Sequence, residues 1–466
     1  MRTKKIHFIG IGGSGNSAVS LIAKRIGFEV SGCDLEAKTA YISQVRREIG
    51  EVFFGHDEKH LKNVDLVVVS PAVLYKKPQQ PEVREAEKKG ILVTWEKFLG
   101  DFLHKGKKVI CVAGTHGKST TTALAGLLLE KASLDPSVVI GAQVKKWRAN
   151  YRFGKGEYFV TEADEFYDNF FNYTPQFIVI NNIEFDHPDY FSSEEKVIES
   201  FAKFVKRLKG EKMLIVNADS PGVKKLLSTL PGKFLKSLRI YGYTFKMKKF
   251  RLVKLIKMTI KSKDCKGTTF LLESKDLDLN NIYYLSIPGE YNVANAAGVV
   301  ILAKFIGINS QVIKKALRSF KGVSRRLELI GEKRGVKLYD DYAHHPTAVK
   351  LTIEALRQKH PGNRIWVIYE PHSFSRTKAL LKKYKGVFAD SDKVIIGPIF
   401  KARDKEKFGV SSHSIVKVSG HKDIKFIPSP VQIAYRVKKE VKKGDVVIVM
   451  GAGYSYKWAR EILGCL

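Results

Sequence analysis

Residues 112–122 (VAGTHGKSTTT) combine the residue types that bind phosphate. Gly114 and Gly117 let backbone N–H groups close around an anion, Lys118 adds a positive charge, and the Ser119 hydroxyl can coordinate Mg²⁺. The two glycines enclose two residues, whereas a usual P-loop has about four there. An apolar run, 108–112, precedes this segment and a helical pattern follows it. We therefore predict a compressed phosphate-binding loop between a strand and a helix.

A second glycine-rich loop, 10–15 (GIGGSG), lies between a predicted strand and a predicted helix near the start of the chain. Its glycines allow close approach to a diphosphate, and Asp34 ends the next strand, near the usual ribose-binding position. Taken alone, this strand–loop–helix pattern favours NAD as the bound ligand. Since the loop at 112–122 can hold ATP, the first loop is free for another diphosphate such as a UDP-sugar.

Polar side chains also follow two strands of the middle segment. The sequence EADE begins at Glu162, after the strand 158–160, and its carboxylates suit Mg²⁺. His187 follows another strand, 177–181, within NNIEFDHP. Imidazole is an uncommon Mg²⁺ ligand, so its chemistry leaves a metal-binding role and a turn or helix-cap role equally open.

Amide and guanidinium groups extend the candidate nucleotide site. Asn292 and Asn295 share one helical face and can read an adenine edge, although capping or core hydrogen bonding explains them too. Arg325 and Arg326 follow the hinge at 321–323. An arginine there can reach a transferring phosphoryl group or form a surface ion pair.

Two clusters in the last third could handle a carboxylate and an amine. The segment 340–346 (DDYAHHP) places two acids and two imidazoles between a strand and a helix. The segment 369–372 (YEPH) ends another strand, and Arg376 follows four residues after His372.

Strand and helix patterns alternate along the chain, which predicts parallel sheets with helical crossovers and ligands at the carboxyl ends of strands. We predict an α/β protein of three domains, at 1–104, 105–323 and 324–466, with a linker at 103–108. The lysine-rich stretch 244–270 is expected to form an antiparallel excursion. Predicted strands are 5–9, 29–33, 64–70, 91–94, 108–112, 158–162, 177–181, 213–217, 336–339, 364–368, 393–396 and 446–450; predicted helices are 14–26, 82–89, 119–129, 292–305, 310–320, 346–359 and 431–440.

Composition narrows the functional class. The 466 residues carry a net charge of +34, which attracts polyanions, yet the lysines are dispersed and no RNA-recognition signature is present. We expect no specific nucleic-acid partner and no membrane insertion, because no run is long and apolar enough and no signal-peptide cleavage region is evident. The cysteines Cys33, Cys111, Cys265 and Cys465 are scattered without metal-binding spacing, so we expect reduced thiols in a cytoplasmic monomer or homodimer.

Taken together, these motifs resemble the Mur ligase family, the ATP-dependent amide-forming enzymes of peptidoglycan synthesis. The resemblance covers almost the whole chain in the family's order, through IGIGGSG, VVVSPAV, GTHGKSTTT, EADE, NNIEFDHPDYF, PGEYNVANA, SRRLE, DDYAHHPTAV, YEPHSFSRT and GAGYS. It implies an N-terminal Rossmann-like domain for a UDP-sugar, a central P-loop ATPase-type domain and a C-terminal Rossmann-like domain for an amino acid. It further implies that the lactyl carboxylate of UDP-N-acetylmuramate forms an acyl phosphate with ATP, which the amine of L-alanine then attacks.

The resemblance also implies roles for individual residues. Lys118, Arg326, His344, His372 and Arg376 would be catalytic. ATP would contact Gly114, Thr115, Gly117, Lys118, Ser119, Thr120, Asn292, Asn295 and Asp341, the last through its ribose. Mg²⁺ would be held by Ser119, Glu162 and, at a second position, His187. The substrates would contact Gly10, Gly12, Gly13, Gly15, Asp34, Ser70 and Tyr342.

Two alternatives compete with this prediction. A recycling ligase that adds a whole tripeptide to the same UDP-sugar shares most of the motifs, and NNIEFDHPDYF leans toward it, whereas YEPHSFSRT favours the alanine reaction. An NAD-dependent oxidoreductase would use the first loop, but the loop at 112–122 and the cluster at 340–346 argue against it.

Overall fold

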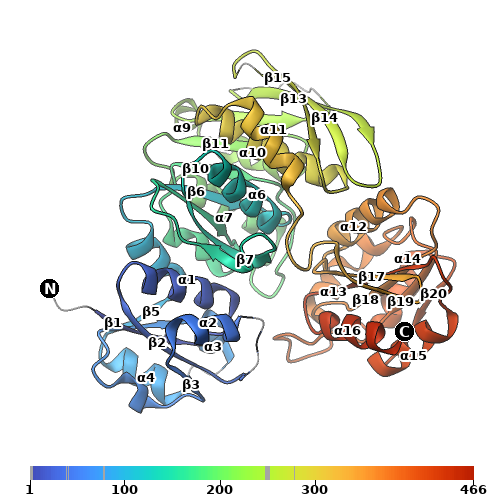
Figure 1. The fold of residues 1–466 in the computed structure, drawn as a ribbon, viewed down its shortest axis with the longest axis horizontal. Helices are drawn as coiled ribbons and strands as arrows, with labels where there is room; N and C mark the ends of the chain where they lie inside the picture. The colour runs from blue at the N-terminus through green and yellow to red at the C-terminus, as the bar shows by residue number, and fades with distance from the viewer. Residues whose placement is uncertain (1–3, 38, 40, 77–78, 247–251, 278) are drawn as a thin grey trace.

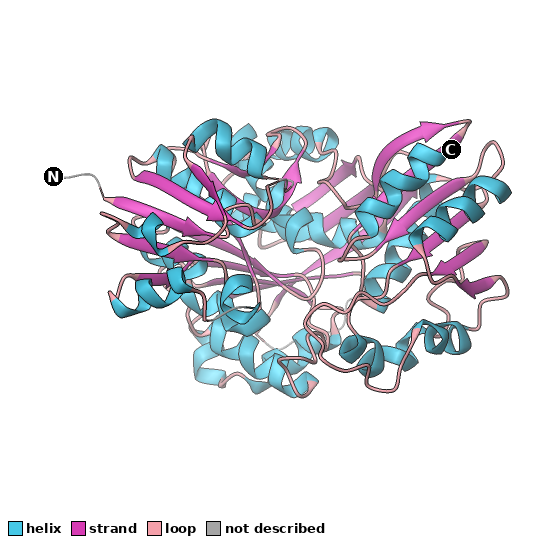
Figure 2. Ribbon diagram, turned by 90° about the horizontal axis from the view of Figure 1, so that it is seen from below, coloured by secondary structure: helices cyan, strands magenta, loops and turns pink. Residues whose placement is uncertain are grey.

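The computed structural model describes residues 4–37, 39, 41–76, 79–246, 252–277 and 279–466. Three α/β bodies follow one another along the chain, each built on its own sheet (Figure 1). Figure 2 shows that helices cover the faces of these sheets. Among the described residues, no helix is long and apolar enough to cross a membrane.

The first body has a five-stranded parallel sheet in the order β3-β2-β1-β4-β5, as the strand–helix alternation predicts. Its strands are β1 (Lys5–Ile9), β2 (Glu29–Asp34), β3 (Val52–Phe54), β4 (Leu66–Val69) and β5 (Leu92–Thr94). Its helices are α1 (Ser14–Arg25), α2 (Ile42–Ile49), η1 (Glu58–Leu61), α3 (Pro71–Lys76), α4 (Pro81–Lys88), α5 (Trp95–Phe98) and η2 (Leu99–Leu103). The glycine loop leads from the end of β1 into α1, at the carboxyl edge of the sheet.

The central body has a ten-stranded sheet in the order β15-β14-β13-β12-β11-β10-β6-β9-β7-β8. Its strands are β6 (Lys108–Ala113), β7 (Ser137–Val144), β8 (Ala149–Arg152), β9 (Tyr158–Ala163), β10 (Phe177–Ile180), β11 (Met213–Asn217), β12 (Arg239–Thr244), β13 (Lys254–Lys263), β14 (Thr268–Ser274) and β15 (Leu279–Leu285). Its helices are α6 (Lys118–Lys131), η3 (Phe166–Asn172), α7 (Glu194–Val205), α8 (Pro221–Thr229), α9 (Gly232–Lys236), α10 (Glu290–Phe305) and α11 (Ser310–Ser319). One core lies under α6, α10 and α11, and another lies under α7 and α8 and continues into the first body.

The predicted antiparallel excursion at 244–270 needs correction. Thr244 ends β12, β13 runs parallel to β12, and antiparallel pairing begins only between β13 and β14. Residues 247–251 of this prediction lie outside the described part of the chain. Lysine-rich alternation signals a strand but not its direction, because direction depends on the connection between strands.

The third body has a six-stranded sheet in the order β16-β17-β21-β18-β19-β20, parallel except for the β16–β17 pair. Its strands are β16 (Glu328–Lys333), β17 (Val336–Asp341), β18 (Ile365–Tyr369), β19 (Lys393–Ile396), β20 (Ile424–Phe426) and β21 (Val446–Met450). Its helices are α12 (Pro346–Lys359), α13 (Phe374–Leu380), η4 (Leu381–Tyr384), α14 (Ser412–Ser419), α15 (Pro430–Glu440) and α16 (Ser455–Cys465). The predicted three-domain α/β fold is confirmed by these sheets.

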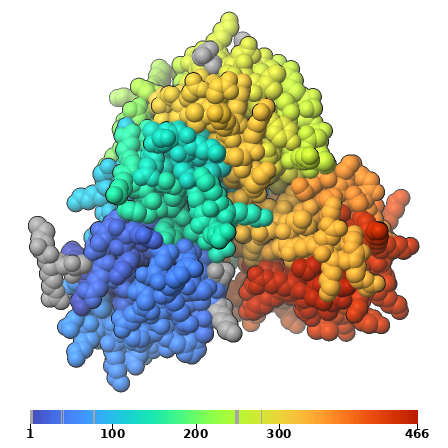
Figure 3. Space-filling model, viewed as in Figure 1, coloured from blue at the N-terminus to red at the C-terminus, as the bar shows by residue number. Residues whose placement is uncertain are grey.

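The outer bodies both pack on the central one. In Figure 3 the N-terminal (blue) and C-terminal (red) bodies meet the central body and diverge from one another toward the lower edge. Asn150 Nδ2 in β8 donates to the carbonyl of Ser14 at 2.5 Å, which joins the first body to the second. Thr347 Oγ1 in α12 donates to Glu184 Oε2 at 2.7 Å, which joins the third to the second.

His104, at the junction of the first two bodies, is a buried imidazole without a hydrogen-bond partner for either ring nitrogen. Its ring packs edge-on against Phe159 and Tyr173. Burial lowers the pKa of His104 to about 3 from an ordinary value of 6.5. Between about pH 6.5 and pH 3 this imidazole is protonated in the unfolded chain but neutral in the folded chain. The free energy of unfolding therefore decreases as the pH falls through this range.

Replacement of this imidazole by an apolar ring removes that pH dependence. We expect His104→Phe to raise the thermal midpoint relative to the parent at pH 5, by an amount corresponding to at most about 2 kcal/mol. At pH 8 the two proteins should unfold within about 1 kcal/mol of each other. Thermal unfolding at both pH values measures the difference, and an equal offset at both would contradict this account.

Candidate active site

The phosphate-binding loop lies between β6 and α6, as predicted. Gly114 and Gly117 have positive φ angles of 131° and 83°, a backbone conformation that favours glycine. A Cβ atom on Gly117 would lie 2.6 Å from Asn295 Oδ1, and one on Gly114 would lie 2.8 Å from the carbonyl oxygen of Asn182. The glycines are therefore required both by the turn and by the atoms packed behind it, backbone at Gly114 and side chain at Gly117.

Lys118, the first residue of α6, forms an ion pair inside the site. Its Nζ donates to Glu165 Oε2 at 2.8 Å and to the Gly114 carbonyl at 2.7 Å. Burial opposes the charge of Lys118, but Glu165 and Asp164 outweigh it and raise the lysine pKa above its usual value. The ammonium is therefore charged and ready to meet an anion.

Glu162 and Ser119 form an oxygen-rich corner beside this lysine. Glu162 Oε1 accepts from the Gly141 N–H at 2.7 Å, and its carboxylate is also hydrogen-bonded to Ser119. Burial raises the pKa of Glu162. A carboxylate and a hydroxyl at the wall of one cavity fit the oxygen-ligand preference of Mg²⁺.

The position of His187 agrees with both roles that the sequence left open, metal binding and a turn. Its φ of 54° and its carbonyl, which accepts from the N–H groups of Tyr190 and Phe191, show a role in a turn. Its ring also lines the cavity and packs against Phe166, with centroids 4.4 Å apart and planes tilted by 32°. Its Nδ1 lies 3.4 Å from the guanidinium of Arg376.

Arg376 connects the central and C-terminal bodies through a buried ion pair. Its Nε donates to Asp186 Oδ1 at 2.6 Å, and a second guanidinium nitrogen donates to His372 Nδ1 at 2.7 Å. Burial works against the charge of Asp186, yet Arg376 holds the pKa of this carboxyl well below its usual range. Only 3% of Arg376 is exposed, so the guanidinium is fixed in position.

The imidazoles of His344 and His372 lie next to each other, with ring centroids 5.5 Å apart. Burial, reinforced by Arg376, lowers the pKa of His372 to about 3 and that of His344 well below its usual value. Both rings are therefore neutral at pH 7. His344 Nδ1 lies 3.0 Å from the Tyr342 carbonyl, an acceptor, whereas His372 Nδ1 faces an arginine donor. These partners leave Nε2 of His344 as an acceptor and Nε2 of His372 as a donor.

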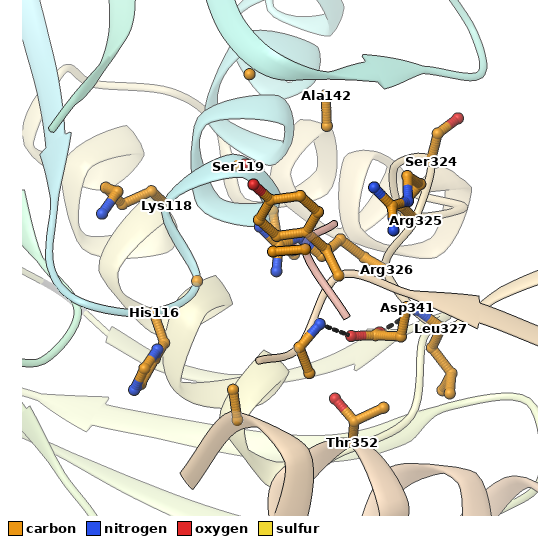
Figure 4. A pocket seen from close by; sticks show the side chains of 18 of the residues that line it. His116, Lys118, Ser119, Ala142, Ser324, Arg325, Arg326, Leu327, Asp341 and Thr352 are labelled. Carbon is orange, nitrogen blue, oxygen red and sulfur yellow. Dashed lines mark hydrogen bonds between the residues drawn. The ribbon is translucent and has the colours of Figure 1, made fainter. Parts of the chain in front are cut away.

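The C-terminal side of the cavity carries two arginines and two acids. Figure 4 shows Arg325, Arg326 and Asp341 facing the phosphate-binding loop across the pocket. Arg325 is held by Asp340 at 3.0 Å and by the Gly451 carbonyl, whereas Arg326 stacks over the Tyr342 ring. Asp341 accepts from the N–H groups of Leu327 and Ala343 at 2.6 and 2.7 Å.

The two asparagines of α10 are buried at the same wall. Asn292 Nδ2 donates to the Pro288 carbonyl at 2.6 Å, and Asn295 lies directly behind Gly117. Both line the cavity. Neither side chain caps α10, whose N-cap is Gly289. Their local hydrogen bonds agree with the core hydrogen bonding that the sequence left open, and their location agrees equally with nucleotide contact.

A single cavity of about 1890 Å³ joins these groups at the meeting point of the three bodies. The predicted residues that line it are Thr115, Gly117, Lys118, Ser119, Thr120, Glu162, His187, Asn292, Asn295, Arg326, Asp341, Tyr342, His344, His372, Arg376 and Gly15. Gly114, Gly10, Gly12, Gly13, Asp34 and Ser70 do not line it. The first glycine loop nevertheless reaches the cavity through Ser14 and Gly15, so the two glycine loops open into the same space.

The N-terminal loop is itself tightly constrained. Gly12 N–H donates to Asp34 Oδ2 at 2.8 Å, and Gly10 N–H donates to the Cys33 carbonyl at 2.9 Å. A Cβ atom on Gly15 would lie 2.4 Å from the Trp95 ring. Asp34 is thus placed across the loop, as its position at the end of β2 predicts.

Family comparisons agree with this arrangement along the chain. Residues 5–107 match the family model "Mur ligase family, catalytic domain", residues 112–303 match "Mur ligase middle domain", and residues 325–453 match "Mur ligase, glutamate ligase domain". A UDP-N-acetylmuramate–L-alanine ligase of Alkaliphilus metalliredigens is 35% identical over 99% of this chain and 97% of its own length. The chain belongs to the Mur ligase family.

Further Mur ligases support the assignment. A UDP-N-acetylmuramate–L-alanine ligase of Caldicellulosiruptor bescii is 37% identical over 96% of both chains. The crystal structure of UDP-N-acetylmuramate-alanine ligase from Thermotoga maritima superposes with a TM-score of 0.78 and 25% identity, over 99% of this chain and 98% of that chain. A murein peptide ligase from Psychrobacter arcticus shares the fold, with a TM-score of 0.69 and 23% identity over 99% of this chain and 98% of that chain.

The sequence did not predict the partners of two acidic residues in this Mur ligase's site. Glu165 belongs to the EADE segment, but its pairing with Lys118 needed the positions of β9 and α6. Asp186 lies just before His187, but its partner Arg376 is 190 residues away. Conversely, Glu370 of the YEPH segment is occupied by three N–H groups at the start of α16, from Gly453, Tyr454 and Ser455. That carboxylate stabilises a helix N-terminus and is not among the residues that line the cavity.

Proposed function

We propose that this Mur ligase joins L-alanine to the lactyl carboxylate of UDP-N-acetylmuramate at the expense of ATP, in peptidoglycan precursor synthesis. One observation carries the proposal: the phosphate-binding loop of the central body and the imidazole and guanidinium groups of the C-terminal body line one cavity. Relatives that align with almost the whole of this chain are named UDP-N-acetylmuramate–L-alanine ligases. Family membership favours a ligase over the oxidoreductase alternative.

On the phosphate side, Lys118 would neutralise the β- and γ-phosphates of ATP, with backbone N–H groups of residues 114–120 around them. Ser119 and Glu162 would hold Mg²⁺, which when bound offsets charge on the phosphate oxygens. His187 is our candidate for a second metal position. Asn292 and Asn295 would face adenine, and Asp341 would face ribose.

On the acyl side, the substrate carboxylate attacks the γ-phosphorus, giving an acyl phosphate and releasing ADP. Phosphate is a far better leaving group than a carboxylate oxygen, so the amine can then attack the carbonyl and expel it. Arg326 and Arg376 supply positive charge toward the phosphoryl and carboxylate oxygens. Nε2 of neutral His344 can accept the proton that the amine loses, and Nε2–H of His372 can donate to an oxygen.

The remaining assignments concern the UDP-sugar. We propose that Gly10, Gly12, Gly13, Gly15, Asp34 and Ser70 hold it, with Tyr342 contacting substrate from the third body. The proposal is supported by Ser14 and Gly15, which line the shared cavity at the carboxyl edge of the first sheet, so a diphosphate bound there would lie toward the second loop. We also propose domain boundaries at 104/105 and 323/324.

The acceptor specificity can be tested directly. Purified protein with ATP, Mg²⁺ and UDP-N-acetylmuramate should release phosphate rapidly with L-alanine, slowly with glycine or L-serine, and not with the tripeptide L-alanyl-γ-D-glutamyl-meso-diaminopimelate. Mass spectrometry identifies the amide product, and omission of Mg²⁺ serves as the control. Preferred turnover of the tripeptide would establish the recycling reaction in place of the alanine reaction.

A further inference from the structure

A second group of chemically reactive side chains is buried in the first body, outside the proposed active site. His7, Cys33, His60 and Glu82 each offer one potential ligand atom, and these four atoms all lie within 4.8 Å of one another. None of these residues lines the cavity between the bodies. The group is therefore a separate feature of the N-terminal body.

The four side chains come from four different elements. His7 is in β1, Cys33 in β2, His60 in the short helix η1, and Glu82 in the first turn of α4. His7 and Glu82 are 0% exposed, and so is Cys33. His60, the least buried of the four, has 14% of its side chain exposed. Four protein ligands that are mostly closed to solvent are typical of a structural metal site.

The contacts within the group centre on the Glu82 carboxylate. Its Oε1 lies 3.1 Å from His7 Nε2 and 3.1 Å from His60 Nδ1. Its Oε2 lies 3.1 Å from Cys33 Sγ. Ligand atoms of a tetrahedral zinc, each about 2.0–2.3 Å from the metal, are separated by similar or slightly larger distances.

His7 directs a buried ring nitrogen toward the Glu82 carboxylate. Its Nδ1 is hydrogen-bonded with Ser31 Oγ at 2.9 Å, and its Nε2 lies 3.1 Å from Glu82 Oε1 without good hydrogen-bond geometry. Because the Ser31 hydroxyl can either donate or accept, both ring tautomers are open to His7. In the tautomer with the proton on Nδ1, the Nε2 lone pair faces Glu82 Oε1, and a cation between these two acceptors would hold them together.

Neighbouring side chains orient these four residues, as outer-shell residues orient the ligands of a metal site. Ser31 orients His7, and Phe53 stacks on the His60 ring with centroids 4.3 Å apart and planes 10° from parallel. His56 Nδ1 lies 3.2 Å from Glu82 Oε2 and 3.0 Å from Cys33 Sγ, where it can donate to either.

We propose that His7, Cys33, His60 and Glu82 bind a structural Zn²⁺ ion. A dication with one thiolate, one carboxylate and two neutral imidazoles carries no net charge, which favours its binding at a largely buried site. Sulfur, nitrogen and oxygen donors in this ratio suit zinc over Mg²⁺. The ion ties η1 and α4 to the sheet and lies next to the loop at 10–15, because the Cys33 carbonyl accepts from the Gly10 and Ile11 N–H groups.

Metal content and a cobalt spectrum test this proposal on the full chain, expressed without an affinity tag. We expect about one zinc per chain by elemental analysis after dialysis. Replacement by Co²⁺ should give a thiolate-to-metal charge-transfer band in the near ultraviolet and tetrahedral d–d bands. Binding of Co²⁺ at the proposed Mg²⁺ site cannot produce the thiolate band, because the predicted ligands there contain no sulfur.

Matched cysteine variants make the result specific. Cys33→Ser should abolish the charge-transfer band, whereas Cys265→Ser, an exposed cysteine remote in sequence, should keep it. Removal of the metal with a chelator should lower the thermal midpoint of the parent and of Cys265→Ser by several degrees. Absence of zinc and of the band in the folded parent would overturn the proposal and leave a protonated imidazole as the partner of Glu82. A band unchanged in Cys33→Ser would also overturn it.

Discussion

Lys118→Ala should reduce kcat for phosphate release by about 10³-fold, because the reaction depends almost wholly on positioned positive charge around the phosphates. Lys118 is the cation at the start of α6, and it is already aimed into the cavity by Glu165 and the Gly114 carbonyl. Steady-state kinetics with saturating ATP, UDP-N-acetylmuramate and L-alanine measures the loss.

The same substitution leaves a buried carboxylate without its partner, so stability needs separate control. Glu165 is only 2% exposed, and loss of the lysine should cost roughly 3 kcal/mol. In Lys118→Ala/Glu165→Gln the unpaired charge is gone, and we expect the thermal midpoint to recover while activity stays low. Lys131→Ala, at the exposed end of the same helix, should keep near-parental activity. Restored activity in the double variant would show that Lys118 acts only through folding.

Arg376→Ala should lower kcat/KM by about 10²–10³-fold and also lower the thermal midpoint. The substitution removes a guanidinium that lines the cavity and the buried link to Asp186 across two bodies. It also frees His372 Nδ1 from its donor, so the ring no longer has a fixed tautomer. Kinetics and thermal unfolding of the same preparation separate the two effects.

Two further variants distinguish a catalytic role of Arg376 from a purely structural one. Arg376→Ala/Asp186→Asn removes both charges, so stability should partly return while activity does not. Arg357→Ala loses a partly exposed ion pair with Asp392 in the same body, outside the cavity, and should stay within about twofold of the parent. Activity that follows the thermal midpoint through all three variants would reduce Arg376 to a purely structural residue.

The two glycine loops show what local sequence can determine. Each is a strand, a glycine turn and a helix in direct succession, so residue types and spacing within about twenty positions fix the backbone and aim its N–H groups. The structure has β6 and α6 around one loop and β1 and α1 around the other, close to the predicted bounds. The same reasoning placed Glu162 and Asp341 at strand ends, because a strand's last residues lie at the sheet edge whatever the neighbouring strands are.

Strands that depend on distant pairing were harder to predict. The β7–β8 pair was not identified, since its register is irregular between Val139 and Val144 and its alternation is weak. The antiparallel prediction for 244–270 is confirmed for the β13–β14 pair and is wrong for the β12–β13 pair, because the sequence shows that a strand exists whereas the connection decides its direction.

By itself, the sequence determined which groups the proposed chemistry can use: two glycine-rich loops, the acids at the strand ends, and the imidazoles and arginines of the third body. Only the tertiary structure decided which of these groups meet. Asp186 with Arg376, and Cys33 with His7, His60 and Glu82, are brought together by sheet order and domain packing. The physical reason is the separation in sequence of the interacting residues. Backbone turns depend on neighbouring residues, whereas the partners of buried side chains depend on how segments far apart in the chain pack together.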